Sequence, residues 1–463
     1  MIRTVRRELR VRSAVAALAA AALLAGCAGA GGIGGSSGEH VLNVLMVNNP
    51  QMLEVQKLTA EHFTEQTGIK VNFTVLPEND VREKISQDLS SPAGMYDVAT
   101  ISNYEVPFYA KNQWLLPLNG RAAKDTAFDQ ADILAPMRDS LTADDGRLYA
   151  EPFYGESSFL MYRKDVFAAK GLTMPAHPTW QQVADLAARA DGAQPGMKGI
   201  CLRGQPGWGE LIAPLTTVVN TFGGTWFTKD WEAQLSSSAF ASATGFYVDL
   251  VRKHGESRAA ESGYAECLND FTHGGTAMWY DSTAAAGSLE AADSPLKGKI
   301  GYAPAPVEKT TADTTGRTTG SGWLYTWAWG VRKTSARPDD AWRFLSWASG
   351  KQYQQLVGRT SGWANVPAGT RASTYVNPEY RAAASAFADV ARKAITSTDP
   401  RNPGRQPRPT IGIQFVGIPE FADLGTKVSY EISNAIAGAE TVDQALDRSQ
   451  ELAEKVAQPY RKR

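Results

Sequence analysis

Four carboxylates each follow an aromatic residue by one or two positions, and this pattern has the clearest chemical use in the sequence. They are Glu105, Glu156, Glu210 and Asp281. Two carboxyls that flank one bond at roughly 5–9.5 Å can cleave a glycoside by acid–base catalysis. Carboxylates that are spread over a cleft instead accept hydrogen bonds from several hydroxyl groups. Both uses stay open at this point, and both indicate a polyhydroxylated ligand.

The stretch 274–290 combines one of these carboxylates with a tryptophan. Residues 277–280 form a short apolar run after two glycines, which predicts a buried parallel strand. Asp281 and Ser282 end the run and are good N-caps for the Ala-rich helix that is predicted next. Ligands of open α/β sheets bind just beyond the carboxyl ends of strands. We therefore expect Trp279 to cover C–H surface of a ligand and Asp281 to accept its hydroxyls. The alternative is a core tryptophan beside a helix cap.

Other polar and aromatic residues extend this candidate site. The chain has 12 tryptophans, and a tryptophan face suits the C–H surface of a carbohydrate. Trp327 and Trp329 occupy odd positions of a strand predicted over 322–331, so they would share one face. The remaining candidates for ligand binding lie in predicted loops and at strand ends: Asn49, Gln51, Tyr104, Tyr154, Arg203, Trp208 and Trp363.

The sequence does not indicate a metal, cofactor or nucleic-acid site. The five histidines are far apart and lack metal-ligand spacing. The loop over 203–210 has no Gly-Lys-Ser/Thr and is not a phosphate loop, and a Gly-x-Ser-x-Gly match at 34–38 follows no predicted strand. Without residues 1–26, which hold five Arg and one Glu, 42 basic and 47 acidic residues remain, a net charge of −5. This balance argues against a nucleic acid as partner.

The N-terminal residues predict export and anchoring. Arginines precede an apolar segment over 14–24, which is too short to span a bilayer comfortably. The segment closes with Leu-Leu-Ala-Gly-Cys at 23–27, which resembles the bacterial lipobox. We expect 1–26 to be a lipoprotein signal peptide, and Cys27 to carry the lipid that anchors the protein to the cell membrane outside the cytoplasm. Residues 27–39 would then be the lipidated cysteine and a Gly/Ser tether.

Two further cysteines, Cys201 and Cys267, fall in one predicted domain. Outside the cytoplasm such a pair can form a disulfide. The alternative is two unrelated buried thiols.

Predicted strands and helices alternate along the chain, which favours a parallel, doubly wound α/β fold. The length exceeds what one small core requires, so two domains are expected. A strand over 299–303 is expected to return to the first domain. The other predicted strands are 41–47, 69–76, 96–101 and 199–202, and the predicted helices include 80–90, 180–190, 211–222, 239–254 and 338–349, with a polar loop over 310–319 and a Pro-rich break over 399–409.

The chain resembles bacterial extracellular solute-binding proteins of family one, the receptors of carbohydrate ABC importers, and within them the sorbitol/mannitol (polyol) branch. The segments that carry this resemblance are Asn-Tyr-Glu-Val-Pro (103–107), Phe-Tyr-Gly-Glu-Ser (153–157), Gly-Ile-Cys-Leu-Arg-Gly (199–204), Gly-Trp-Gly-Glu (207–210), Met-Trp-Tyr-Asp (278–281), Trp-Ala-Trp (327–329), Gly-Trp-Ala-Asn-Val-Pro (362–367) and Gln-Phe-Val-Gly-Ile-Pro-Glu (414–420). They span nearly the whole of the chain after the tether.

The resemblance implies a type II periplasmic-binding-protein fold, with two α/β lobes joined by crossing strands and closing on a ligand like a hinge. We expect the N-terminal lobe to comprise 40–151 and 301–349, and the C-terminal lobe 152–300 and 350–463. The implied function is a monomeric receptor that binds a sugar alcohol or small sugar, without a cofactor, and delivers it to ABC permease subunits. A secreted glycosidase-like enzyme that uses the cleft carboxylates is the alternative, and an adhesin or sensor module is a third.

Overall fold

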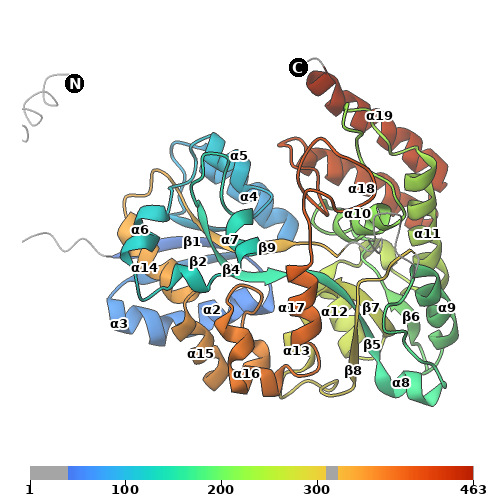
Figure 1. The fold of residues 1–463 in the computed structure, drawn as a ribbon, viewed down its shortest axis with the longest axis horizontal. Helices are drawn as coiled ribbons and strands as arrows, with labels where there is room; N and C mark the ends of the chain where they lie inside the picture. Colours follow the sequence, from blue (N-terminus) through green and yellow to red (C-terminus); the bar gives the residue numbers. More distant parts are fainter. Residues whose placement is uncertain (1–39, 309–321, 462–463) are drawn as a thin grey trace, which may run out of the picture. The chain divides into compact units, whose positions relative to one another are not determined.

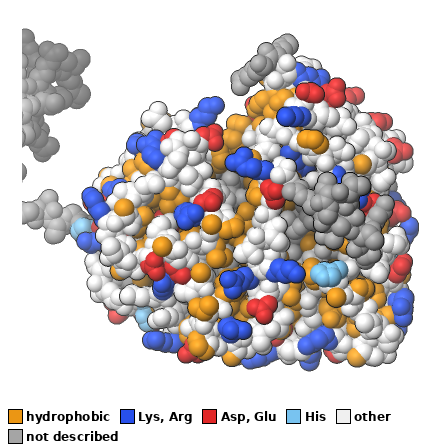
Figure 2. Space-filling model, viewed as in Figure 1, with side chains coloured by type: hydrophobic (Ala, Val, Ile, Leu, Met, Phe, Trp, Pro, Cys, Tyr) orange, Lys and Arg blue, Asp and Glu red, His pale blue; other side chains and the backbone are white. Residues whose placement is uncertain are grey.

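The computed structural model describes residues 40–308 and 322–461 and contains two β-sheets with helices around them (Figure 1). The predicted signal peptide, Cys27, the tether, the 34–38 match and the 310–319 loop lie outside these residues. Among the described residues, no helix combines the length and the apolar composition that crossing a bilayer requires. Acidic and basic side chains are interspersed over the face in Figure 2, without one large basic patch.

The first sheet has the strand order β2-β1-β3-β9-β4 and the second has the order β6-β7-β5-β8. β1 pairs in parallel with β2 and β3, whereas β9 is antiparallel to both β3 and β4. In the second sheet, β7 is parallel to β6 and antiparallel to β5. The strands are β1 (Val41–Val47), β2 (Lys70–Leu76), β3 (Val98–Ser102), β4 (Ala150–Glu156), β5 (Ser158–Arg163), β6 (Lys198–Cys201), β7 (Thr276–Ser282), β8 (Ile300–Pro304) and β9 (Tyr325–Val331).

Helices connect most of the strands, as the alternating pattern predicted. Several begin at capping residues that the sequence makes plain. Thr179 forms a capping box with Gln182 at the start of α9, and the Asn49 side chain caps α2 by accepting from Met52 N. The helices are α2 (Pro50–Thr59), α3 (Glu65–Thr67), α4 (Glu78–Ser90), α5 (Val106–Lys111), α6 (Asn119–Lys124), α7 (Ala135–Ser140), α8 (Lys164–Ala169), α9 (Trp180–Ala190), α10 (Ile212–Thr221), α11 (Ser238–His254), α12 (Tyr264–Thr272), α13 (Ala285–Leu289), α14 (Pro338–Ala348), α15 (Lys351–Thr360), α16 (Pro378–Ala383), α17 (Ala388–Thr396), α18 (Phe421–Ala437) and α19 (Val442–Arg461).

The chain passes from the first sheet to the second at Ser157, between β4 and β5 (Figure 1). The expectation that residues 299–303 return to the first sheet is wrong. β8 pairs with β5 and extends the second sheet, where Tyr302 packs on Phe159 at 5.2 Å between ring centroids. The chain therefore returns to the first sheet later than expected, between β8 and β9.

A second correction concerns residues after 349, which were assigned to the C-terminal lobe. α15 packs with the first sheet, because Tyr353 lies 5.9 Å from Phe153 of β4 and 5.0 Å from Trp347 of α14, measured between ring centroids. The predicted boundary at 350 therefore lies too early in the chain.

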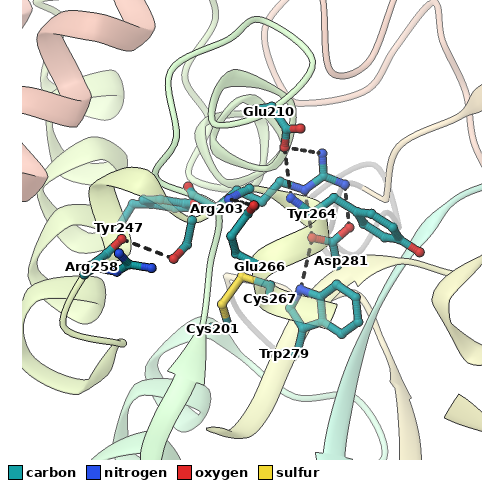
Figure 3. Close-up of a disulfide and its surroundings, with 12 residues drawn as sticks. Cys201, Arg203, Glu210, Tyr247, Arg258, Tyr264, Glu266, Cys267, Trp279 and Asp281 are labelled. Carbon is teal, nitrogen blue, oxygen red and sulfur yellow. Dashed lines mark hydrogen bonds and ion pairs between the residues drawn. A yellow bond between two sulfur atoms is a disulfide. The ribbon is translucent and has the colours of Figure 1, made fainter. Parts of the chain in front are cut away.

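Cys201 and Cys267 form a disulfide, which confirms the first of the two interpretations of this pair. The bridge connects the last residue of β6 to α12. It therefore fixes α12 against the second sheet, close to the residues described next (Figure 3).

Candidate ligand-binding site

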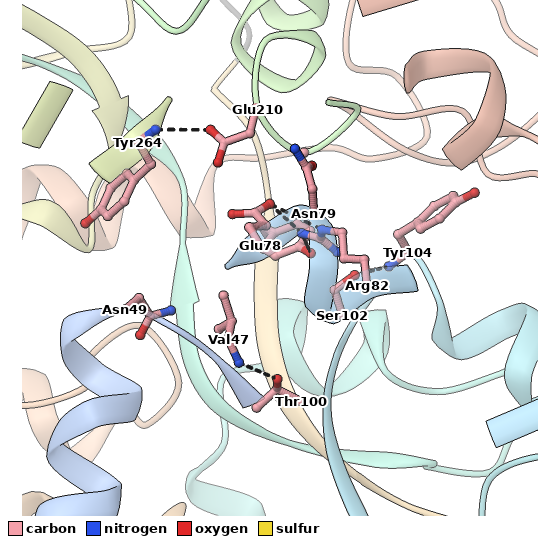
Figure 4. A network of polar contacts seen from close by, with 12 residues as sticks. Val47, Asn49, Glu78, Asn79, Arg82, Thr100, Ser102, Tyr104, Glu210 and Tyr264 are labelled. Carbon is pink, nitrogen blue, oxygen red and sulfur yellow. Dashed lines mark hydrogen bonds and ion pairs between the residues drawn. The ribbon is translucent and has the colours of Figure 1, made fainter. Parts of the chain in front are cut away.

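A cavity of about 400 Å³ is lined by residues from around both sheets. Figure 4 shows Asn49 and Glu78, which follow strands of the first sheet, across from Glu210 and Tyr264 near the second. Contributions from the first sheet and the helices after its strands are Asn48, Asn49, Gln51, Glu78, Asn79, Asp80, Arg82, Tyr154, Glu156, Tyr325 and Trp327. Contributions from the second sheet and its connections include Arg203, Gln205, Trp208, Glu210, Tyr264, Glu266 and Ser282.

Arg203 holds two of the predicted carboxylates on one side of the cavity (Figure 3). Its Nε donates to Asp281 Oδ2 at 2.8 Å and its Nη2 to Asp281 Oδ1 at 2.6 Å. Its Nη1 donates to Glu210 Oε2 at 3.3 Å and to the Gly209 carbonyl at 2.9 Å. All three charged side chains are buried, so the ion pairs are little screened by water.

Asp281 is buried and does not line the cavity, which corrects the expectation for it. It is a residue of β7 and does not cap a helix, since α13 begins at Ala285. Trp279 Nε1 donates to Oδ2 at 3.0 Å and Ser282 N to Oδ1 at 2.6 Å, in addition to the two bonds from Arg203. A carboxylate has about four acceptor sites, so none of those on Asp281 remains for a ligand hydroxyl.

Trp279 does not face the cavity either. Its side chain has no exposed surface, and its ring packs on Tyr264 at 5.6 Å and Phe271 at 6.0 Å between centroids. Both faces of β7 are buried along its whole length. The alternative interpretation is therefore correct for Trp279, which is a core tryptophan. It is wrong for Asp281, which is an ion-pair partner of Arg203 and not a helix cap.

Glu210 lines the cavity and also positions α12. Its Oε2 accepts from the backbone N of Tyr264 at 3.0 Å, at the first residue of that helix. Burial raises the pKa of Glu210 to about 7, although the charge of Arg203 acts in the opposite direction. The Tyr264 ring lies beside Arg203, with 5.3 Å from the guanidinium carbon to the ring centroid.

Glu156 is the buried acid at the end of β4. Ser282 Oγ donates to Glu156 Oε2 at 2.5 Å. Burial raises the pKa of Glu156 to about 8, although the hydrogen bond from Ser282 and the charge of Arg203 lower it. This side chain is therefore mostly protonated at pH 7, and a protonated carboxyl can donate a hydrogen bond as well as accept one.

The start of α2 brings two amides to the cavity. Asn49 Nδ2 donates to Tyr154 OH at 2.9 Å while its Oδ1 caps the helix. Gln51 Nε2 donates to the Ala284 carbonyl at 3.2 Å, which joins α2 to the loop after β7.

Arg82 closes one side of the cavity. Its Nη2 donates to Glu78 Oε1 at 2.8 Å and its Nη1 to Glu105 Oε1 at 2.9 Å. Its guanidinium carbon lies 4.2 Å from the ring centroid of Trp208 and 4.7 Å from that of Trp327. The cation is therefore held between two aromatic faces and paired with two carboxylates.

Two further lining residues carry a buried polar atom that has no hydrogen-bond partner within the described parts of the chain. These atoms are Nε1 of Trp323, a donor, and Oε1 of Gln414, an acceptor. Leaving a buried polar group unpaired costs about 1–3 kcal/mol. Polar atoms of this kind next to a cavity are expected to bind ligand or water.

The structure brings together eight of the fourteen predicted ligand residues. Those that line the cavity are Asn49, Gln51, Tyr154, Glu156, Arg203, Trp208, Glu210 and Trp327. Tyr104 and Glu105 line a second cavity instead. Trp329 packs on Phe153 and Phe344 in the core, because its place on β9 lies deeper in the sheet than that of Trp327. Trp363 lies in a short 3-10 helix against Gly358 of α15.

Sequence reasoning missed several lining residues, among them Glu78, Arg82, Tyr264, Trp323, Tyr325 and Gln414. Trp323 and Tyr325 belong to the same aromatic stretch as Trp327, and Gln414 begins a segment that carries the family resemblance. Glu78 begins α4 just after β2, and Arg82 lies one turn further along that helix, so the strand-end rule applied to β2 would have pointed to this region.

The sequence and the structure both match known proteins. A family model described as bacterial extracellular solute-binding protein matches residues 49–355. The chain is 38% identical over 411 residues to the mannitol-binding protein of Pseudomonas aeruginosa, across 89% of this chain and 91% of that protein. It is 27% identical over 334 residues to the erythritol/L-threitol-binding protein of Mycolicibacterium smegmatis, across 67% of each chain.

One solved structure matches over nearly its whole length. It is the crystal structure of an ABC transporter solute-binding protein from Agrobacterium vitis with bound D-mannitol. The TM-score is 0.86 with 40% sequence identity, across 91% of this chain and 99% of that one.

Proposed function

The chain belongs to the bacterial extracellular solute-binding protein family, and from this membership we propose that it is the receptor of an ABC importer that binds a sugar alcohol. Its fold is the type II periplasmic-binding-protein fold. The observation that carries the proposal is the cavity of about 400 Å³, lined by aromatic rings and by buried donors and acceptors, in a chain that is 38–40% identical to proteins that bind mannitol.

The chemistry of the cavity suits an acyclic polyol. Such a ligand has a hydroxyl on every carbon, so it requires donors and acceptors in similar number and apolar surface for its C–H groups. Asn49, Gln51 and Arg203 supply donors, and Glu78 and Gln414 supply acceptors. Trp323, Tyr325 and Trp327 supply aromatic surface. The volume lies toward the small end of the range of about 300–1,000 Å³ for small-molecule sites.

The glycosidase alternative is set aside. The relatives that share the fold and 38–40% of the sequence are solute-binding proteins of transporters, so the protein is not an enzyme. The carboxylates also have other partners: Arg82 binds Glu105, and Arg203 binds Glu210 and Asp281.

The family is extracellular, which places the protein outside the cytoplasm. We propose in addition that Cys27 carries a lipid, that 28–39 tether the folded part to the cell membrane, and that the receptor acts as a monomer that docks on two permease subunits. The lipobox-like sequence at 23–27 supports the anchor.

We propose that two lobes close around the ligand, each built on one sheet, with the strand connection at Ser157 as one crossing. The first lobe would comprise 40–156 and 323–360, and the second 158–304 with most of the C-terminal helices. The aromatic contacts of α15 and the pairing of β8 support these revised boundaries.

Calorimetric titration of the purified protein with D-mannitol, D-sorbitol, ribitol and maltose tests the proposal. We expect saturable 1:1 binding of at least one alditol with a Kd of roughly 1 μM, about −8 kcal/mol. Binding of maltose alone, or of none of the four, would contradict the assignment to sugar alcohols.

A further inference from the structure

A second cavity, of about 600 Å³, lies on the other side of Arg82 and Trp208. Both side chains line the first cavity as well. The exposed residues Asn79 and Asp80 form a rim that the two cavities share. Arg82 and Trp208, which we call the partition, therefore separate two spaces that would otherwise be continuous.

The guanidinium of Arg82 spans the partition. Glu78, which it binds at 2.8 Å, lines the first cavity, while Glu105, which it binds at 2.9 Å, lines the second. Figure 4 shows Arg82 between Glu78 and Tyr104, another residue of the second cavity. Tyr325 OH accepts from Nη2 at 2.5 Å. These contacts hold the side chain in one position, because its charge is buried and paired on both sides.

Trp208 is fixed equally firmly. Its ring lies 4.5 Å from Tyr104, 6.5 Å from Phe415 and 6.4 Å from Phe421, measured between centroids. It is buried, and it belongs to the loop after β6 of the second sheet, whereas Arg82 belongs to α4, which follows β2 of the first.

The backbone of this loop packs closely against the side chains at the start of α4. A Cβ on Gly209 would lie 2.3 Å from Glu78 Oε1, and Gly207 has a φ of +146° next to the Asn79 side chain. Asn79 Nδ2 donates to the Pro206 carbonyl at 3.1 Å. The loop and the start of α4 therefore meet without space for a ligand to pass between them.

The second cavity has a lining that suits a sugar ring. Tyr104, Tyr109 and Trp114 offer aromatic surface, and Glu83, Glu105 and Asn112 offer polar groups. These side chains are of the same kinds as those in the first cavity.

We infer that the Arg82–Trp208 partition limits the length of the ligand to one polyol or monosaccharide unit, and that the cavity behind it is a subsite for a second sugar unit that the partition closes off. The inference rests on the proposed function, because it assumes that the first cavity binds a polyol. One extra methylene in a hydrophobic pocket already changes discrimination by about 10–200-fold, and a glucose unit is much larger than a methylene.

The test compares D-sorbitol with maltitol, which is sorbitol extended by one glucose unit, by calorimetry on the full chain. The first variant is Arg82→Ala with Glu105→Gln, which removes the guanidinium together with one of its counter-charges. The second is Trp208→Ala, which opens the partition from the other side. Val376→Ala, at an exposed position that lines neither cavity, is the control.

We expect the wild type to bind sorbitol at least about tenfold more tightly than maltitol, and both partition variants to reduce this ratio about tenfold or more by gaining maltitol affinity. The control should keep the wild-type ratio. Equal affinity of the wild type for both compounds would overturn the inference. A partition variant that melts cooperatively and binds sorbitol, but keeps the wild-type ratio, would overturn it too, and either variant suffices if the other does not fold. A wild type that binds no alditol would instead overturn the proposed function, and the inference would fall with it.

Discussion

Arg203 binds Asp281 through two parallel hydrogen bonds, Nε to Oδ2 at 2.8 Å and Nη2 to Oδ1 at 2.6 Å, in a place where neither side chain reaches solvent appreciably. The same two-pronged geometry occurs between Arg163 and Asp165, at 2.8 and 2.7 Å, but there the aspartate side chain is 40% exposed. The chain thus contains one version of this interaction in which both partners are buried and one in which the carboxylate is exposed.

Asp281→Asn is expected to lower the free energy of unfolding by about 3–5 kcal/mol, because it leaves the buried charge of Arg203 without its principal partner. Asp165→Asn should cost no more than about 1 kcal/mol, because water screens the exposed pair. Urea denaturation of both variants measures the difference. Equal small losses would show that Glu210 alone neutralises Arg203.

Trp323→Phe is expected to weaken alditol binding by about two- to tenfold, because it removes the unpartnered indole N–H beside the cavity and keeps most of the aromatic surface. Trp329→Phe is the matched control, since its Nε1 also lacks a partner within the described residues but the ring packs in the core. Calorimetric titration gives both affinities. A larger loss of alditol affinity for Trp329→Phe than for Trp323→Phe would indicate that Trp329 belongs to the binding site.

Glu156→Gln is expected to change how stability depends on pH. The folded protein keeps the proton of Glu156 up to a pKa of about 8, while the ordinary pKa is 4.5. The contribution of Glu156 is therefore fully present below pH 4.5 and is lost as pH rises toward 8. Relative to Glu156→Gln, the wild type should lose up to about 1.4 kcal/mol of stability per pH unit in this window.

Denaturation series at pH 5, 7 and 9 check this difference between variant and wild type. Glu151→Gln is the control for ligand binding, because burial raises the pKa of Glu151 to about 8 as well, but Glu151 does not line the cavity. Glu151→Gln should change the pH dependence of stability in the same way as Glu156→Gln. Its alditol affinity should depend on pH as that of the wild type does. A flat difference for Glu156→Gln would mean that this carboxyl is ionised in the folded protein.

Cys27→Ser is expected to move the protein from the membrane fraction to the soluble fraction, because the serine hydroxyl cannot take the place of the lipid-bearing thiol. Fractionation followed by immunoblotting measures the distribution. A variant of residue 36, Ser36→Ala, lies in the same tether and should stay with the membranes. Unchanged association of Cys27→Ser would contradict the anchor.

Much of the fold could be predicted because local signals and tertiary packing agree. β1 and α9 have the predicted bounds, since an apolar run and a Thr179 cap define them without help from distant contacts. The return of the chain to the first sheet was placed too early, because a short apolar strand such as β8 has no local feature that selects its partner. Its pairing with β5 and the packing of Tyr302 on Phe159 decide it.

The site could be predicted in part for a similar reason. A strand that is buried on both faces has no polar alternation, so the sequence around Trp279 could not tell which side the ring occupies. Glu78 and Arg82 look like an ordinary i, i+4 ion pair on a helix surface. They become cavity residues only because the loop that contains Trp208 closes over them.

The disulfide between Cys201 and Cys267 has a practical consequence for biosynthesis. The sequence contains three cysteines, so once these two are bridged the remaining sulfhydryl is that of Cys27. Alkylating reagents attack the thiolate of a free cysteine. Under non-reducing conditions, unprocessed precursor should therefore take up one equivalent of reagent, while protein whose Cys27 sulfur carries a lipid thioether should take up none. Intact-mass spectrometry of the alkylated protein would give the fraction of the protein that has matured.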